Sequence, residues 1–419
     1  MSVRRGAAAI GAAAALALTA GCGALGLGGE EPESDEARLV GMLNEGYRIE
    51  AELSAAEYRI IQNCLEAQGF TIHDQWSIMS WDAYEQESLT DYYPHEEFLI
   101  DPDEAAEYGF GQWANSPDGW EDPASEEYYD AQNAKWEEEE GDDWEEPDNS
   151  EFEGQEPEDQ YNWYVAFYGE EYVTQNYGTL QEYTDMYTGE GDYDESAEGD
   201  IVEDFPEDDG SLVVENDEMY VEPKPGGCQM EMIQALYGEP TLVEETFEDD
   251  GGGGYSYWSY RPENPSYGGD EFWETIEFDY ADAMGDTQYE FLDCISARGH
   301  EGWEFTEYNS LPIWEFFAEL YYQNASEEER MWWSDGPSSI EVPPLPDDAG
   351  SSYEEWKVYE SKLAVDFAEC GEETDYAKTS EDAYEAANLK AYSALEEDFY
   401  AWQDEMNDAI KKAQEILDA

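Results

Sequence analysis

The strongest helical pattern in this chain lies in residues 353–417, which read YEEWKVYESKLAVDFAECGEETDYAKTSEDAYEAANLKAYSALEEDFYAWQDEMNDAIKKAQEIL. Apolar side chains recur there at alternating spacings of four and three residues, which places them on one face of a helix. We expect two helices, 353–369 and 380–417, that form an α-hairpin packed on the rest of the chain; an intermolecular coiled coil is the alternative. The apolar face of the second helix comprises Leu395, Phe399, Trp402, Met406, Ala409, Ala413 and Ile416.

Similar patterns upstream favour a mainly α fold with irregular acidic segments. Residues 36–68 are expected to be helical with a break near Ser54, because a serine can cap the start of a second helix. Further helices are expected at 228–237 and 312–322, and an ordered stretch at 161–187. A Gly/Pro-rich linker at 249–270 is expected to separate an N-terminal half, 38–248, from a C-terminal half, 271–419. Within the acidic, aromatic-rich middle of the first half, 137–159 has the composition of mobile chain.

The N-terminus has the organisation of an export signal. Arg4 and Arg5 precede an apolar run that is too short to span a bilayer, so residues 1–21 are expected to be a signal peptide. The segment Leu18-Thr19-Ala20-Gly21-Cys22 resembles the lipobox of bacterial lipoproteins, in which the cysteine receives diacylglycerol. This resemblance implies that Cys22 is lipidated, that 22–37 is a lipid-anchored tether, and that the protein lies on the outer face of the cell membrane. A plain secretory signal with an incidental cysteine is the alternative.

Four further cysteines, Cys64, Cys228, Cys294 and Cys370, suit two disulfides in an exported chain. They are far apart and form no CxxC, which argues against zinc. Of the three pairings we favour Cys64 with Cys228 and Cys294 with Cys370, because Cys64 and Cys294 lie in similar sequence. Each ends an amphipathic run and is followed five residues later by a glycine that suits a helix end. These pairs would give two disulfide-stapled halves; buried free thiols are the alternative.

Three short segments carry a family resemblance. They are CLEAQGF at 64–70, CISARG at 294–299 and AVDFAEC at 364–370, the last followed by a long C-terminal helix. Together they resemble secreted actinobacterial lipoproteins of unknown function. The resemblance implies export, a lipid anchor and disulfide bonds, and it implies no activity.

Charge narrows the classes of partner. The chain has 108 Asp and Glu against 16 Lys and Arg, a formal net charge of −92, with no basic patch, which excludes a nucleic-acid binder. Because acid replaces base along the whole chain, the composition favours adaptation to high salt, where screening relieves self-repulsion. Divalent-cation binding is an alternative with weak candidates at 101–104 and 248–250, so metal ligands stay unassigned. A docking surface for a basic envelope protein is another.

Motifs for catalysis are missing from the sequence. His73, His95 and His300 have no metal-binding spacing, and no nucleophile-elbow, phosphate-binding or dinucleotide-binding motif stands in a strand-to-helix context. We expect no enzyme activity and no cofactor; a carboxylate-dependent hydrolase is a remote alternative.

Aromatic clusters suggest contact with sugar rings, although core packing is the commoner use of such residues. The sequence therefore predicts an exported, lipid-anchored envelope or surface protein without catalytic activity. The alternative is an accessory protein that binds cell-wall glycan or divalent cations. Expected partners are the membrane, through Cys22, and a wall glycan or a basic envelope protein. The aromatic clusters comprise Trp113, Trp120, Trp136, Trp144, Tyr255, Tyr257, Trp258 and Tyr260.

Overall fold

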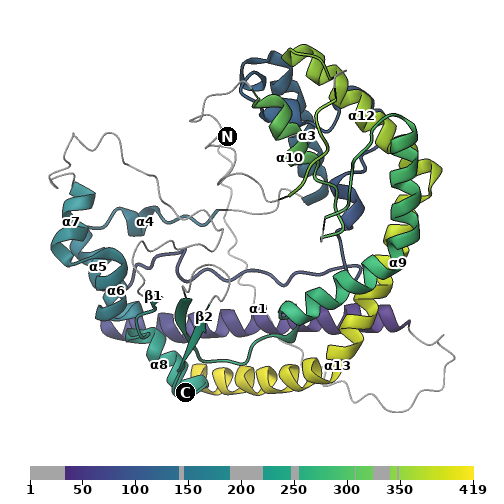
Figure 1. The fold of residues 1–419 in the computed structure, drawn as a ribbon. Coiled ribbons are helices and arrows are strands. Elements are labelled where there is room, and N and C mark those ends of the chain that lie inside the picture. Colours follow the sequence, from purple (N-terminus) through teal and green to yellow (C-terminus); the bar gives the residue numbers. More distant parts are fainter. Residues whose placement is uncertain are drawn as a thin grey trace, which may run out of the picture. The chain divides into compact units, whose positions relative to one another are not determined.

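The computed structural model describes residues 34–140, 146–188, 220–246, 254–306, 308–323, 340–346 and 349–419. Within them the fold is mainly helical, as the sequence predicts (Figure 1), and Asp35–Ala419 form one compact unit. The helices are α1 (Asp35–Gln68), α2 (Pro102–Tyr108), α3 (Pro123–Glu140), α4 (Ser150–Glu153), α5 (Pro157–Tyr168), α6 (Glu170–Tyr177), α7 (Leu180–Thr188), α8 (Gly227–Leu236), α9 (Asp270–Ala297), α10 (Ile313–Tyr321), α12 (Tyr353–Glu373) and α13 (Tyr376–Leu417). Short 3-10 helices are η1 (Pro94–Glu97), η2 (Gln112–Asn115), η3 (Gly119–Glu121) and η5 (Pro265–Tyr267).

The described residues also contain one small sheet. Its strands are β1 (Tyr220–Val221), β2 (Thr241–Thr246) and β3 (Gly254–Ser259), in the order β1-β3-β2. β3 pairs antiparallel with β2 and parallel with β1. Both β3 and η5 lie inside the interval 249–270 that the sequence marks as a linker, of which 249–253 lies outside the described residues.

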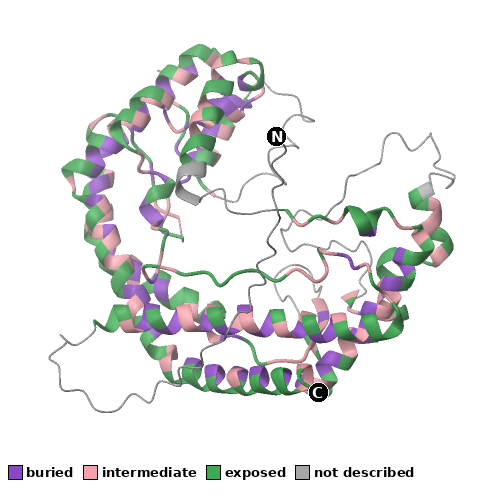
Figure 2. Cartoon of the chain, turned by 180° about the vertical axis from the view of Figure 1, so that it is seen from behind, coloured by how far each residue is buried: buried purple, intermediate pink, exposed green. Residues whose placement is uncertain are grey.

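The longest described helix is α13, and α1 packs along the C-terminal half of α13. Arg38, near the start of α1, pairs with Glu396, and the Gln403 side chain donates to the Met42 carbonyl at 2.8 Å, so the two helices run parallel (Figure 1). The apolar face predicted for α13 is largely buried here (Figure 2), which leaves it covered by α1 rather than free for a coiled coil with another chain. This core includes Leu39, Leu43, Ile49, Leu53, Phe399, Trp402 and Met406.

The helix α9 packs against the N-terminal half of α13 and runs antiparallel to it. Phe272 near the start of α9 contacts Tyr392, with ring centroids 5.1 Å apart, and Phe291 near its end contacts Tyr376 at 5.2 Å. The helix pair α12 and α13 is confirmed, but it turns within Thr374 and Asp375, so both helices are longer than predicted. Asp375 has φ 51°, a left-handed conformation that suits such a sharp turn.

Cores do not follow the two sequence halves. Phe98 and Trp113, from the first half, are buried among α9, α10 and α12 of the second. Conversely, Ala413 of α13 is buried with Trp163 and Cys228. Each disulfide nevertheless joins two cysteines of the same half. The hydrophobic cores, in contrast, contain residues from both halves.

One expectation from the sequence, the helix break near Ser54, is wrong. α1 is continuous through Ser54, which is 6% exposed, because packing of its buried face outweighs the capping preference of serine. The segment 137–159 contains the end of α3, α4 and the start of α5, and Phe152 is buried against Trp163, with ring centroids 5.1 Å apart. One buried aromatic side chain thus orders part of a segment whose acidic composition suggests mobility; residues 141–145 lie outside the described part.

Candidate functional sites: disulfide-linked helix ends and a tyrosine pocket

The four cysteines lie where the sequence places them. Cys64 joins Cys228, with Cα atoms 5.7 Å apart, and Cys294 joins Cys370 at 5.8 Å. The first bond links the end of α1 to the start of α8, and the second links the end of α9 to α12. Cys22, the predicted lipidation site, lies outside the described residues.

The similar sequences around Cys64 and Cys294 form the same helix end. Gly69 has φ 103° and Gly299 φ 99°, the left-handed conformation that glycine adopts without strain. The residue after each glycine donates its N–H to the carbonyl five residues earlier: Phe70 at 3.1 Å and His300 at 3.0 Å. These bonds are those of a Schellman motif. Cys64 and Cys294 therefore lie shortly before a well-defined helix end.

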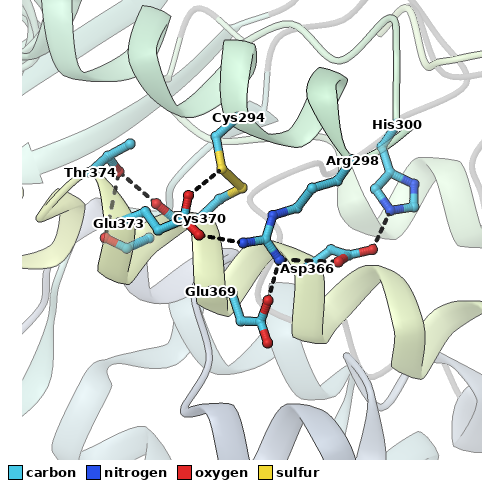
Figure 3. The surroundings of a disulfide bond; sticks show 9 residues. Cys294, Arg298, His300, Asp366, Glu369, Cys370, Glu373 and Thr374 are labelled. Atoms are coloured by element: carbon cyan, nitrogen blue, oxygen red, sulfur yellow. Dashed lines mark hydrogen bonds and ion pairs between the residues drawn. A yellow bond between two sulfur atoms is a disulfide. The ribbon is translucent and has the colours of Figure 1, made fainter.

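Beside the second disulfide, one guanidinium gathers several carboxylates (Figure 3). Arg298 pairs with Asp366 at 3.2 Å, with Glu373 at 2.7 Å and with Glu369. The hydrogen bond from Arg298 to Glu369 is the main cause of the raised pKa of the guanidinium. His300 Nε2 lies 2.8 Å from Asp366 Oδ2. The ion pairs of Arg298 hold α9 against α12. The neighbouring cysteines offer no free thiol, because their sulfurs are bonded to each other.

The other two histidines lie in separate cores. Trp163 Nε1 donates to His73 Nδ1 at 3.2 Å, and His95 Nδ1 lies 3.0 Å from Ser380 Oγ. Burial lowers the pKa of both His73 and His95, which favours the neutral ring. The structure brings none of the three histidines together.

The described residues contain no group of three or more His, Cys, Asp or Glu side chains able to hold a metal ion. In the candidate segment 101–104, Asp101 accepts from the N–H groups of Asp103 and Glu104, and so caps α2. Glu104 also pairs with Lys135 at 3.4 Å. In the second candidate segment, residues 248–250 lie outside the described part of the chain.

The aromatic clusters chosen from the sequence have mixed positions. Trp113 is 4% exposed and lies beneath the ammonium group of Lys357, which is 3.6 Å from its ring centroid; Trp120 is 60% exposed. Tyr255 and Tyr257 donate from β3 to Glu245 at 2.6 and 3.1 Å. Trp258 lies on β3 and Tyr260 just beyond it, while the side chains of Trp136 and Trp144 lie outside the described part.

A different set of aromatic residues lines a cavity of about 640 Å³. This tyrosine pocket lies between α1, the loop 84–92, α9 and α13, and its size suits a small ligand. Its walls come from four separate segments, so no single stretch of sequence predicts it. The loop sequence YEQESLTDYY at 84–93, in which tyrosines at both ends enclose three acidic residues, is the one local signal. The aromatic residues of the lining are Tyr47, Tyr84, Tyr92, Trp273, Tyr384 and Tyr392.

Hydrogen bonds hold the loop of the tyrosine pocket against α1. The Asn44 side chain donates to the Gln86 carbonyl and accepts from the Gln86 N–H, both at 2.9 Å, as a neighbouring strand would. The Tyr47 hydroxyl donates to the Gln86 side chain at 3.2 Å. Gln86 in turn donates to the Ser88 carbonyl at 2.9 Å. The loop backbone is therefore positioned by side chains of a rigid helix.

Phenol groups around the tyrosine pocket resist ionisation. Burial raises the pKa of Tyr392 to about 12. Burial also raises the pKa of Tyr84, and the carboxylate of Asp91 adds to the effect by accepting from its hydroxyl at 3.3 Å. These phenol groups therefore stay neutral well above physiological pH.

A buried carboxyl group lies outside this pocket. Glu360 of α12 is fully buried and accepts from the N–H groups of Gln112 at 2.8 Å and Trp113 at 3.1 Å, and from the Tyr321 hydroxyl at 2.5 Å. Burial raises its pKa to about 7 in spite of these bonds. Glu360 therefore ties η2 to α12 and α10, a structural role.

Comparison of the chain with protein-family models, with curated proteins and with solved structures finds no match. Among the described helices, none combines the length and the apolarity needed to cross a bilayer.

Proposed function

We propose that this chain is an exported, lipid-anchored envelope protein that binds a small ligand in the tyrosine pocket and performs no catalysis. The pocket carries the proposal: it is a cavity of ligand size, lined by six aromatic residues and three carboxylates, and one of its walls is a loop that is hydrogen-bonded to α1. The first 22 residues support export and lipidation at Cys22. Two disulfides support a compartment in which cysteines stay oxidised.

Adaptation to high salt belongs to the same proposal. The net charge of −92 would expand a compact chain at low ionic strength. The scarce bases are placed where they neutralise nearby acids: Arg298 pairs with three carboxylates, and Lys357 pairs with Asp122 at 2.6 Å. Salt near 1 M shortens the screening length to about 3 Å, which relieves repulsion among the remaining acids.

Binding of a neutral wall glycan is the second candidate. Trp273 and Tyr84 are 42% and 54% exposed at the pocket, and exposed rings of this kind stack on sugars. Hydrolysis of a glycan has less support, because it needs two carboxyl groups on either side of the scissile bond. The carboxylates of the lining, Glu85, Glu87 and Asp91, all come from one loop.

The anchor is tested by replacing Cys22 with alanine. The wild-type chain, Cys22→Ala and a neighbouring control, Gly23→Ala, are expressed in a bacterial host and fed an alkyne-tagged fatty acid. We expect label and membrane retention in the wild type and in Gly23→Ala, and loss of both in Cys22→Ala. Equal labelling of Cys22→Ala would refute lipidation at this residue.

A further inference from the structure

Six aromatic rings meet in the tyrosine pocket from different parts of the fold. Tyr47 comes from α1, Tyr84 and Tyr92 from the loop, Trp273 from α9, and Tyr384 and Tyr392 from α13. The face of an aromatic ring carries the negative part of its quadrupole, so it attracts a cation placed within about 6 Å of its centroid. Rings that converge from several directions can enclose such a cation.

Charges in the lining act in the same direction. Glu85, Glu87 and Asp91 are exposed, and Glu85 and Glu87 have no ion-pair partner among the described residues. The described residues that line the pocket include no Lys, Arg or His. A bound cation would therefore find carboxylates beside the rings, whereas a bound anion would find no positive partner.

The bases that lie beside Tyr47 on α1 and near Tyr392 on α13 are already paired. Arg48, next to Tyr47 on α1, pairs with Glu45 at 2.8 Å. Lys390, two residues before Tyr392 on α13, pairs with Asp279 at 2.6 Å. The carboxylates of the loop therefore set the sign of the field in the pocket.

A metal ion fits this lining poorly. Calcium takes six to eight oxygen ligands, while the carboxylates of the lining are only Glu85, Glu87 and Asp91, all from one loop. One of the carboxylates, Asp91, is already hydrogen-bonded to Tyr84. The described residues hold no cluster of three metal-ligating side chains, here or elsewhere.

We propose that the tyrosine pocket binds a small organic cation, a quaternary or alkylated ammonium group whose methyl groups contact the rings and whose charge the loop carboxylates balance. This inference rests on the proposed binding function and names its ligand class. Contact between a cation and a ring face acts at short range, so it persists at a salt concentration that screens distant charges. The site therefore suits the high-salt medium that the composition favours.

The test compares two ligands of the same shape that differ in charge. Choline and its uncharged isostere 3,3-dimethylbutan-1-ol are titrated by calorimetry into residues 23–419 with both disulfides intact, at constant ionic strength. This segment includes the whole compact unit Asp35–Ala419. We expect saturable binding of choline that is at least about tenfold tighter than binding of the isostere.

Variants locate the binding site. Trp273→Ala is expected to weaken choline binding about tenfold, because the variant loses one ring face. Glu87→Gln is expected to weaken it to a smaller degree, and more at low salt than at high salt. The control is Trp120→Ala, which removes a tryptophan that is 60% exposed and lies outside the pocket, and it should leave affinity unchanged. Unfolding curves of each variant show whether the fold is intact.

The results distinguish failure of the ligand class from failure of the binding function of the pocket. If the isostere binds as tightly as choline, the cation inference is wrong. If a neutral oligosaccharide binds, choline does not, and Trp273→Ala abolishes sugar binding, the pocket is a binding site but its ligand class is wrong. If the folded protein binds neither ligand, both the cation inference and the binding function of the pocket are refuted.

Discussion

We predict that Glu360→Gln removes a loss of stability that the wild-type protein suffers between about pH 4.5 and pH 7. Burial raises the pKa of Glu360 from 4.5 to about 7 in the folded chain. The folded state therefore holds this proton more tightly than the unfolded state does. Its contribution to stability is fully present below pH 4.5 and is lost as the pH rises through 7.

The magnitude follows from the pKa shift and the hydrogen bonds. A shift of this size corresponds to roughly 3 kcal/mol of unfolding free energy at about 1.4 kcal/mol per pH unit. Glutamine stays neutral, but its NH2 group cannot accept, so one of the two backbone N–H groups, of Gln112 or Trp113, loses its partner. That loss costs about 1–3 kcal/mol. The variant should be less stable than the wild type near pH 4.5 and equally or more stable above pH 8.

Urea unfolding measured from pH 4.5 to 8.5 at constant salt gives the free energy of each protein. The difference between variant and wild type cancels the titration of the other carboxyl groups. Glu45→Gln is the control, because the hydrogen bond from Arg48 lowers the pKa of Glu45. Its stabilising contribution is fully present above pH 4.5 and is lost only at lower pH, so the free-energy difference between Glu45→Gln and the wild type should stay constant across this range.

A free-energy difference for Glu360→Gln that does not change with pH would refute the reasoning. It would mean that burial leaves the acidity of this carboxyl group as it is in the unfolded chain. A destabilisation that grows as the pH rises would also refute it, since the hydrogen bonds from Tyr321 and the two N–H groups would then outweigh burial.

Three further predictions concern the helix ends, the staples and the solvent. Gly299→Ala should destabilise the fold by about 1 kcal/mol, because φ is 99° at this position. Gly285→Ala lies inside α9 with open space at its Cβ position, so it should stabilise the fold by up to about 1 kcal/mol. Urea unfolding measures both effects. Replacing Cys294 and Cys370 together by alanine should lower the unfolding free energy by about 4 kcal/mol, and a loss below about 1 kcal/mol would contradict the expected loop constraint. NaCl should raise the melting temperature steadily, while millimolar CaCl2 at constant ionic strength should add nothing saturable; a saturable rise would reveal a specific calcium site.

Local sequence patterns predict much of the fold. The 3–4 spacing of apolar residues in 380–417 predicts α13 because helix periodicity is a property of neighbouring residues. The repeated Cys-x-x-x-x-Gly pattern predicts two equivalent helix ends, and both form with Gly69 and Gly299 in left-handed conformations. The same pattern led to the cysteine pairing that the structure contains.

Long-range packing explains the features that local sequence patterns do not predict. Ser54 stays inside a continuous α1 because the helix is held along its length, and Phe152 orders an acidic segment by entering a distant core. Neither effect is visible from a local preference, since each depends on which residues arrive from elsewhere in the chain. Glu360 is likewise unremarkable among 108 acidic residues until the η2 loop closes over it.

The sequence by itself determined the helical class, the two disulfide-linked helix ends and the extreme negative charge, because each depends on local spacing or on composition. The tertiary structure alone decided that α13 is shared by α1 and α9, and that Tyr47, Tyr84, Trp273 and Tyr392 line one cavity. Those residues come from segments as far apart as α1 and α13, and only the packing of the long helices brings them within reach of one ligand.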